Sequence, residues 1–319
     1  MIEGIPKISV LVICYKQEEL IKRAINSLLA QKDYIYEICV SDDCSPDRTW
    51  EVLQEYDKQY PGLFKLHQNR PNVGIFENIE YTWTMPSGDI IYQLSGDDEC
   101  GKDWFKTVIE YVKEHKIDYK NTNFCIYGDY KAVYPNGDYF VRTNNLASKY
   151  CNDSLSLSIR QLISPRSACF SIKILKQFIK VSKGRSYVAE DAIDKQIALF
   201  TDKSYYIPHV GNVYYARIGV CVNMSSQDHK GRLGIFKYTY DFLKKQDKLS
   251  RKNAYYLLYK DALLQYNYNK ICKNLFKVWK YQHLALVPRY DFNVAAIERI
   301  IFAIRRRLPH KKILAMKIG

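Results

Sequence analysis

The sequence lacks long apolar segments, and this excludes several classes of protein. No run reaches the roughly 18 consecutive apolar residues that mark a membrane-spanning helix. The opening residues, MIEGIPKISVLVICYK, carry no basic segment ahead of an apolar stretch that is itself too short for a secretory signal. There is also no internal repeat and no low-complexity tract. We therefore expect an ordered protein in the cytoplasm.

Cysteine spacing excludes two further kinds of framework. The nine cysteines are scattered, odd in number and never spaced as Cys-x-x-Cys. This pattern argues against a disulfide scaffold and against a zinc site, and it favours a reducing compartment.

Basic charge is unevenly distributed along the 319 residues. The net charge is +14, yet residues 1–227 hold 27 Lys and Arg against 28 Asp and Glu, whereas residues 228–319 hold 21 against 6. A neutral region followed by a basic one indicates attachment to an anionic surface rather than general nucleic-acid binding. We expect a catalytic domain over residues 1–225 and a basic, Tyr-rich helical extension over residues 226–319.

Strand and helix patterns alternate four times in the first hundred or so residues. Such alternation predicts βαβ units with a parallel sheet. The expected strands are Ile8–Cys14, Ile35–Ser41, Phe64–His67 and Asp89–Leu94. Beyond Asp118 the pattern changes to a β-hairpin over residues 124–142, a short strand and helix within 162–178, and two short strands at 205–209 and 212–217.

Three acidic pairs fall where a ligand site is expected. Asp42-Asp43 and Asp97-Asp98 follow the second and fourth strands, at the carboxyl edge where open α/β sheets bind ligands. Glu190-Asp191 opens a later helix, and there an acid could remove a proton from an incoming hydroxyl. Each pair alone also fits ordinary structure, because Asp is common in turns and acids are favoured at helix N-termini.

Together these segments resemble the family 2 glycosyltransferases. The resemblance covers about residues 7–217 and is carried by ISVLVICYKQEELIKRAINSLLAQ, YEICVSDDCSPDRT, NVGIFENIEY, GDIIYQLSGDDE and the later Glu-Asp pair. It implies the GT-A fold, a Rossmann-like, mainly parallel central sheet flanked by helices. It also implies an inverting, nucleotide-sugar-dependent transferase.

The resemblance assigns the donor site residue by residue. Tyr15 would lie near the nucleotide, Asp43 would contact its base, and Asp42 would support that loop. Asn72 and Gly74 match the Asn-x-Gly that shapes the donor pocket.

The remaining assignments concern the metal and the proton. Asp97 would meet the ribose or a metal, and Asp98 would hold Mn²⁺ or Mg²⁺ on the diphosphate, since these ions prefer oxygen ligands. Asp191 would be the catalytic base, with Glu190 beside it. Family members often carry Asp where this chain has Ser95, and His where it has Gly219.

The last residues form a second candidate surface. Residues 297–319 combine an apolar stripe of isoleucines with seven Lys and Arg against one Glu. This pattern favours an interfacial helix on anionic lipid, and the alternative is a solvated helix packed on the domain. No base-reading module accompanies the basic residues, so no nucleic-acid partner is expected.

The sequence thus predicts an enzyme of cell-surface polysaccharide synthesis (capsule, O-antigen or exopolysaccharide). It would move a sugar, with a UDP-sugar favoured as donor, to a glycan or polyprenyl-linked acceptor at the inner face of the cytoplasmic membrane. Two alternatives remain. A nucleotidyltransferase would ordinarily need a glycine-rich loop after the first strand, where this chain has Cys14-Tyr15-Lys16-Gln17-Glu18. A non-catalytic GT-A-fold binding protein would bind donor without turnover.

Overall fold

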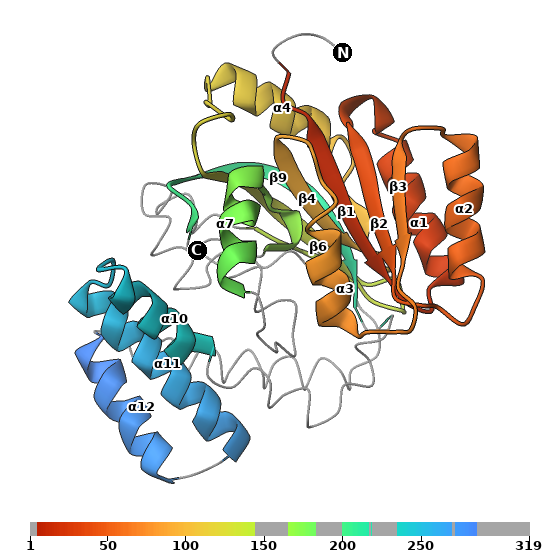
Figure 1. The fold of residues 1–319 in the computed structure, drawn as a ribbon. Coiled ribbons are helices and arrows are strands. Elements are labelled where there is room, and N and C mark those ends of the chain that lie inside the picture. The colour runs from red at the N-terminus through yellow and green to blue at the C-terminus, as the bar shows by residue number, and fades with distance from the viewer. Residues whose placement is uncertain are drawn as a thin grey trace. The chain divides into compact units, whose positions relative to one another are not determined.

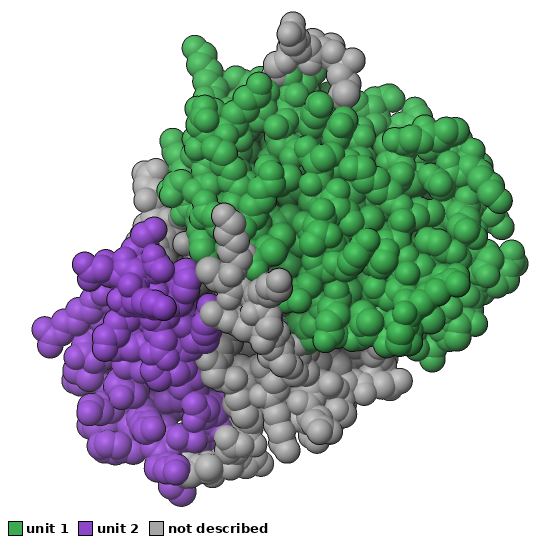
Figure 2. All heavy atoms as spheres, in the orientation of Figure 1, with its two compact units in different colours: residues 1–223, 314–319 green, residues 224–313 purple. Residues whose placement is uncertain are grey.

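The computed structural model describes residues 5–143, 165–182, 200–216, 218, 235–269 and 272–285. The chain divides into two compact units, residues 1–223 with 314–319 and residues 224–313 (Figure 2). The predicted boundary at 225/226 stays a prediction, because the residues around it lie outside the described ranges.

Unit 1 begins with the predicted βαβ alternation (Figure 1). Four parallel strands lie in the order β3-β2-β1-β4, so the chain winds outward from β1 and then returns to its other side. β1 and β2 are buried along their whole length, which explains why their sequences are apolar runs rather than alternating patterns. The elements are β1 Ile8–Cys14, α1 Glu18–Leu29, the 3₁₀ turn η1 Lys32–Tyr34, β2 Glu37–Asp42, α2 Thr49–Gln59, β3 Phe64–Gln68, α3 Ile75–Thr82 and β4 Ile90–Ser95.

The second half of the sheet is mixed. β8 Cys169–Ser171 runs antiparallel between β4 and β6 Phe124–Val133, and β6 pairs in parallel with β9 Lys203–Tyr215. β5 Glu99–Cys100 closes the order on the far side of β9. The predicted hairpin is confirmed, since β7 Tyr139–Arg142 pairs antiparallel with β6. The prediction of two short strands at 205–217 is wrong, because the structure has the single long strand β9.

Helices cover both faces of this sheet (Figure 1). The apolar stripes of α1, α2 and α4 Trp104–Glu114 pack on one face with the inward side chains of β1 and β4. On the opposite face lie α3 and α7 Ile172–Ser182, whose first turn follows β8 directly. The predicted GT-A architecture of a mainly parallel, helix-flanked sheet is confirmed.

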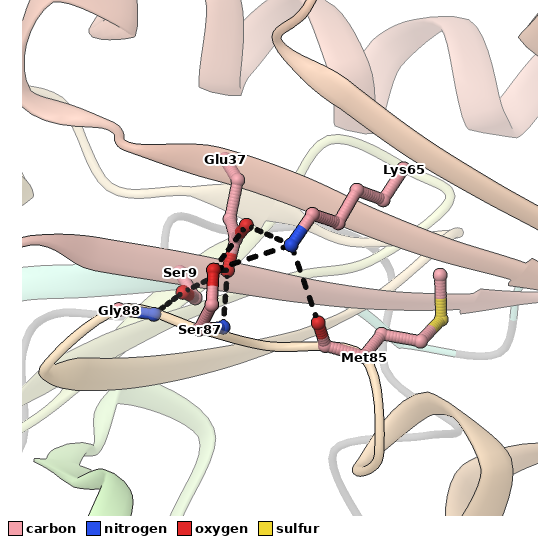
Figure 3. A network of polar contacts seen from close by, with 6 residues as sticks. All are labelled: Ser9, Glu37, Lys65, Met85, Ser87 and Gly88. Atoms are coloured by element: carbon pink, nitrogen blue, oxygen red, sulfur yellow. Dashed lines mark hydrogen bonds and ion pairs between the residues drawn. The ribbon is translucent and has the colours of Figure 1, made fainter.

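A buried carboxylate joins the amino ends of three strands, at the edge opposite the candidate site (Figure 3). Glu37 on β2 accepts hydrogen bonds from Ser9 Oγ (2.6 Å) and from the Ser87 backbone N–H (2.6 Å). Lys65 Nζ on β3 lies 2.6 Å from the same carboxylate, and Gly88 N–H donates to Ser9 Oγ at 2.9 Å. Burial raises the pKa of Glu37, but these donors outweigh it and hold the pKa below its usual value.

Unit 2 is helical where it is described. It contains α10 Ile235–Lys245, α11 Arg251–Asn269 and α12 Cys272–Leu284. Tyr259, Ala262 and Val278 form a small core between α11 and α12. The predicted helical character of the extension is confirmed for these residues, while the basic segment 297–319 lies outside the described ranges.

Two sequence expectations can be compared with the described residues. Within these ranges no helix has both the length and the apolar character needed to cross a membrane. The seven cysteines in the described part of the chain are free, and five of them are buried.

Candidate active site

Strand β1 places two acidic motifs on either side of itself. At its carboxyl end, the Cys14 carbonyl accepts a hydrogen bond from the Asp43 N–H (3.0 Å), and the Ile13 carbonyl accepts one from the Gly96 N–H (3.0 Å). These contacts extend the ladders to β2 and β4 by one residue each. The loop carrying Asp43 and the turn carrying Asp97 therefore flank one strand end, where a doubly wound sheet binds its ligand.

Asp43 holds together residues 69–74, which form the donor loop. Its buried carboxylate accepts hydrogen bonds from Asn69 Nδ2 (3.0 Å), Val73 N–H (2.9 Å) and Gly74 N–H (2.9 Å). Asn72 Nδ2 in turn donates to the Asp43 carbonyl at 2.6 Å. Gly74 has φ +90°, a conformation that favours glycine, and it precedes the first turn of α3. Asp43, Asn72 and Gly74 thus form one hydrogen-bonded unit.

Asp42 has no solvent exposure and points into the loop. It accepts hydrogen bonds from Ser45, through both its hydroxyl and its N–H (3.1 Å for the latter), and from Gln68 Nε2 at 3.0 Å. The Cys14 thiol lies 3.7 Å from the same carboxylate. Burial, with Asp42 beside it, raises the pKa of Cys14 well above its usual value, so this thiol is not an activated nucleophile.

A second layer of polar groups lies behind Asp43. Asn69 Nδ2 also donates to Asn78 Oδ1 (2.9 Å), which accepts a further hydrogen bond from Ser41 Oγ (2.5 Å). His67 Nε2 donates to Asn69 Oδ1 at 3.0 Å, and its ring stacks on Tyr81. The sequence analysis did not identify His67, Asn69 or Asn78 as site residues. Nothing in their spacing indicates that they meet.

The second acidic motif is a tight turn after β4. Asp98 N–H donates to the Ser95 carbonyl at 3.0 Å, and only 2% of Asp98 is exposed. Its Oδ1 accepts a hydrogen bond from the Tyr215 N–H (3.1 Å) at the end of β9, and its Oδ2 lies 3.4 Å from Arg166 Nη1. Two segments that are distant in the sequence, at Arg166 and at Tyr215, therefore contact the Asp98 carboxylate.

The charge of this turn is incompletely balanced. Burial and the neighbouring Asp97 raise the pKa of Asp98 to about 7, although Arg166 opposes them. Burial likewise raises the pKa of Asp97. A divalent cation would favour the ionised carboxylates, and one or two carboxylates with substrate phosphates are a usual ligand set for Mg²⁺. The donor set therefore fits the expected Mn²⁺ or Mg²⁺.

Two arginines from separate elements border the turn. Arg23 on α1 donates from Nη2 to the Asp97 carbonyl (2.5 Å), and its guanidinium lies over the Tyr215 ring, 3.5 Å from the ring centroid. Arg166, on the 3₁₀ turn η2 Pro165–Ser167, lies 3.9 Å from the Tyr214 ring centroid. Arg23 and Arg166 are not among the site residues predicted from the sequence.

The other predicted residues are distributed as follows. Half-buried Tyr15 follows β1 directly, and Lys16 Nζ lies 5.2 Å from its ring centroid. Asp191, its neighbour Glu190, and Gly219 lie outside the described residues. The structure therefore brings together the predicted donor and metal residues and leaves the predicted base as a prediction.

The fold is that of GT-A glycosyltransferases, as the architecture above establishes. Residues 9–167 match the family model described as Glycosyl transferase family 2. The chain belongs to the family 2 glycosyltransferases, as its motifs predicted.

Individual relatives cover the chain to different extents. The putative glycosyltransferase EpsE of Bacillus subtilis is 27% identical over 111 residues, or 35% of this chain and 40% of EpsE. Hyaluronan synthase of Pasteurella multocida is 22% identical over 92% of this chain and 29% of its own length. The chain spans about a quarter of the length (26%) of uncharacterized mycobacterial relatives that are 32% identical over 91 residues.

One solved structure extends the likeness to most of the fold. The structure of Staphylococcus aureus TarS residues 1–349, in complex with UDP-GlcNAc, superposes with a TM-score of 0.56. The two share 16% sequence identity over 89% of this chain and 92% of that one. At this identity the likeness concerns the fold alone.

Proposed function

We propose that this protein transfers a sugar from a nucleoside-diphosphate sugar to a hydroxyl of a glycan or lipid-linked acceptor. Family membership and the named activities of EpsE and hyaluronan synthase support a role in cell-surface polysaccharide synthesis. A UDP-sugar is the favoured donor, in keeping with the UDP-GlcNAc in the TarS complex.

One observation carries the proposal. The end of β1 is hydrogen-bonded on one side to Asp43 and on the other to Gly96, at the head of the Asp97-Asp98 turn. A nucleotide spanning this edge would meet the Asp43 loop with its base and the acidic turn with its ribose and diphosphate. Tyr15, directly after β1, would lie beside it.

Asp42 and Asp43, the first acidic pair, differ in their contacts and therefore in their proposed roles. Asp43 contacts the donor loop and would meet the base, with Asn72 and Gly74 shaping the pocket. Asp42 has no exposed surface and acts through the loop that it holds, so we assign it a positioning role.

The second pair would hold a divalent metal on the diphosphate, with Asp98 as the principal ligand and Asp97 beside it. Bound there, the ion would offset the charge of the departing nucleoside diphosphate. Arg166 and Arg23 add fixed positive charge at the same place and orient the turn through Asp98 and the Asp97 carbonyl.

Asp191 is proposed as the base. It would take the proton of the acceptor hydroxyl as that oxygen attacks the anomeric carbon from the face opposite the leaving group. One displacement of this kind inverts the anomeric configuration and needs no protein nucleophile. We further propose that the enzyme works peripherally at the inner face of the cytoplasmic membrane, with the basic C-terminal region on anionic lipid.

The first test is a thermal-shift panel of UDP, GDP, CDP and dTDP, each with and without Mn²⁺. A ligand that binds the native state raises its stability by about 2.7 kcal/mol at a hundredfold excess over Kd. We expect a metal-dependent shift with UDP that is lost in Asp98→Ala. Folded protein that responds to none of the four nucleotides contradicts the proposed donor site.

The second test distinguishes the three candidate functions by the product that the protein releases from the donor. The proposed enzyme releases nucleoside diphosphate from its donor sugar, and Asp191→Asn should abolish release while keeping the UDP shift. Pyrophosphate as product would instead identify a nucleotidyltransferase. Donor binding without turnover, across a panel of glycan and polyprenyl-linked acceptors, would indicate a non-catalytic binding protein.

A further inference from the structure

Helix α12 has one face that packs and one that does not. Val278 contacts the small core with α11, and Asn274 and Ala285 are buried on the same side. A helix turns by about 100° per residue, so residues 276, 279, 280 and 283 lie on the side away from this core.

That outer face is aromatic. Phe276 is 63% exposed and Trp279 is 62% exposed, far more than ordinary large apolar side chains. The rings of Phe276 and Trp279 lie 6.1 Å apart, and His283 stacks on Trp279 with ring centroids 6.4 Å apart. Leu275 and Leu284 are also exposed, at 45% and 39%. The row of Phe276, Trp279 and His283 is therefore continuous over about two turns.

Basic residues accompany the aromatic ones. Exposed Lys280, Lys273 and Lys277 lie along one flank of this aromatic stripe, since a helix turns by about 100° per residue, and α12 contains no Asp or Glu. Across the described residues of unit 2 there are ten Lys and Arg against three Asp. An aromatic stripe with lysines alongside is the arrangement of helices that lie at the membrane–water interface.

We propose that this α12 face is a docking surface for an anionic lipid bilayer. Phe276 and Trp279 enter the boundary between headgroups and acyl chains, while the three lysines contact lipid phosphates. Charge complementarity selects this occupant, because the three lysines beside the rings, with no acidic residue on α12, would repel a second copy of the same surface. The inference rests on the proposed peripheral location and not on the proposed sugar transfer.

The test uses the full chain and vesicles of phosphatidylcholine with or without phosphatidylglycerol, in a flotation assay without donor. Wild-type protein should bind the anionic vesicles. The double variant Phe276→Ser/Trp279→Ser should lose at least about tenfold in affinity, equivalent to about 1.4 kcal/mol. Lys273→Gln/Lys277→Gln/Lys280→Gln should remove the preference for phosphatidylglycerol.

Matched variants on unit 1 control for general effects of composition. Tyr34→Ser/Tyr139→Ser removes two exposed aromatic side chains, and a triple Lys→Gln variant at Lys58, Lys106 and Lys113 removes the same charge. Both controls should bind vesicles as wild type does. Retained melting temperature and UDP shift in every variant exclude misfolding.

Three results would overturn the inference. These are vesicle binding that is absent in the wild type, unchanged in the α12 variants, or lost only when Arg305, Arg306 and Arg307 are replaced. Self-association of the wild type that disappears in Phe276→Ser/Trp279→Ser, without vesicle binding, would make the face a contact between copies. None of these results bears on donor binding, so failure here is distinguishable from failure of the proposed function.

Discussion

Gly96 connects β4 to the acidic turn, and the absence of a side chain there leaves room for the Gln17 amide. A Cβ at this position would overlap Gln17 Oε1 and lie 3.0 Å from Ile21 Cδ1 and 3.1 Å from Cys14 Cβ. Gln17 is buried, and its Oε1 has no hydrogen-bond partner among the described residues. Space at the turn is thus limited by the buried side chain of Gln17, the residue before α1, and by Ile21 on α1.

We predict that Gly96→Ala destabilises the protein by about 1–3 kcal/mol, the usual range for overpacking. It should also weaken the metal-dependent UDP shift, because the Asp97-Asp98 turn would be displaced. Urea unfolding and the nucleotide panel measure the two effects. Gln17→Ala in the same chain removes the overlapping group and should restore most of both. Failure of this rescue would show that another contact limits the turn.

Individual residues were predicted to different extents. Asp42, Asp43, Asp97 and Asp98 could be located because strand ends are visible in the sequence pattern. Arg166 could not, since 68 residues separate it from Asp98 and no local pattern relates them.

At the scale of elements, the network around Glu37 holds the amino ends of β1, β2 and β3 together. Its carboxylate has a pKa below the usual value of about 4.3 for Glu. For such a group the stabilisation is fully present above the unfolded-state pKa, and it disappears as pH falls through the folded-state pKa. The contribution of the network should therefore be constant near neutrality and vanish in acid.

We predict that Glu37→Gln lowers the free energy of unfolding by about 1–3 kcal/mol at pH 7, the cost of weakening a buried, charge-assisted hydrogen-bond set. The difference from wild type should shrink as pH falls below about 4.3. Urea unfolding between neutral and acidic pH measures it. Glu55→Gln, at an exposed ion pair with Arg48, should show no such pH-dependent difference. A constant difference for Glu37→Gln at all pH values contradicts the prediction.

Strand β9 is a single strand where the sequence predicted two, at 205–209 and 212–217. The expected break lay at Val210-Gly211, two residues after Pro208, which has no N–H to donate to a ladder. In the structure the pairing passes from Tyr127 opposite Tyr206 to Asp129 opposite Val210. This register shift leaves Pro208 outside the ladder, so the strand continues past it. Helix α4 and the short strand β5 were not among the predicted elements either.

At the scale of the whole molecule, the two functions proposed differ in their sensitivity to salt. The basic excess lies in residues 228–319 and on exposed lysines of α12, whereas Asp43 and Asp98 are buried. Exposed charges are screened over about 8 Å at physiological ionic strength, and buried groups are screened much less.

We predict that raising the salt concentration to about 1 M, where the screening length falls to about 3 Å, removes binding to anionic vesicles. The Mn²⁺-dependent thermal shift by UDP should fall far less, because its ligands lie in the sheet edge. Flotation and thermal-shift assays on one preparation compare the two. Vesicle binding that survives high salt while UDP binding fails would contradict this separation.

The sequence by itself determined the alternation of strands and helices, the parallel pairing expected of the first four strands, and the positions of the acidic pairs at strand ends. These features depend on local periodicity and on turns a few residues long. Tertiary structure alone decided which partners those acids have. The Tyr215 N–H and Arg166 contact Asp98, and Asn69 contacts Asp43, only because the fold places the end of β9, η2 and the end of β3 next to these acids. Such contacts join residues that are far apart in the chain. Their energies depend on how deeply each group is buried, and local sequence patterns do not predict that burial.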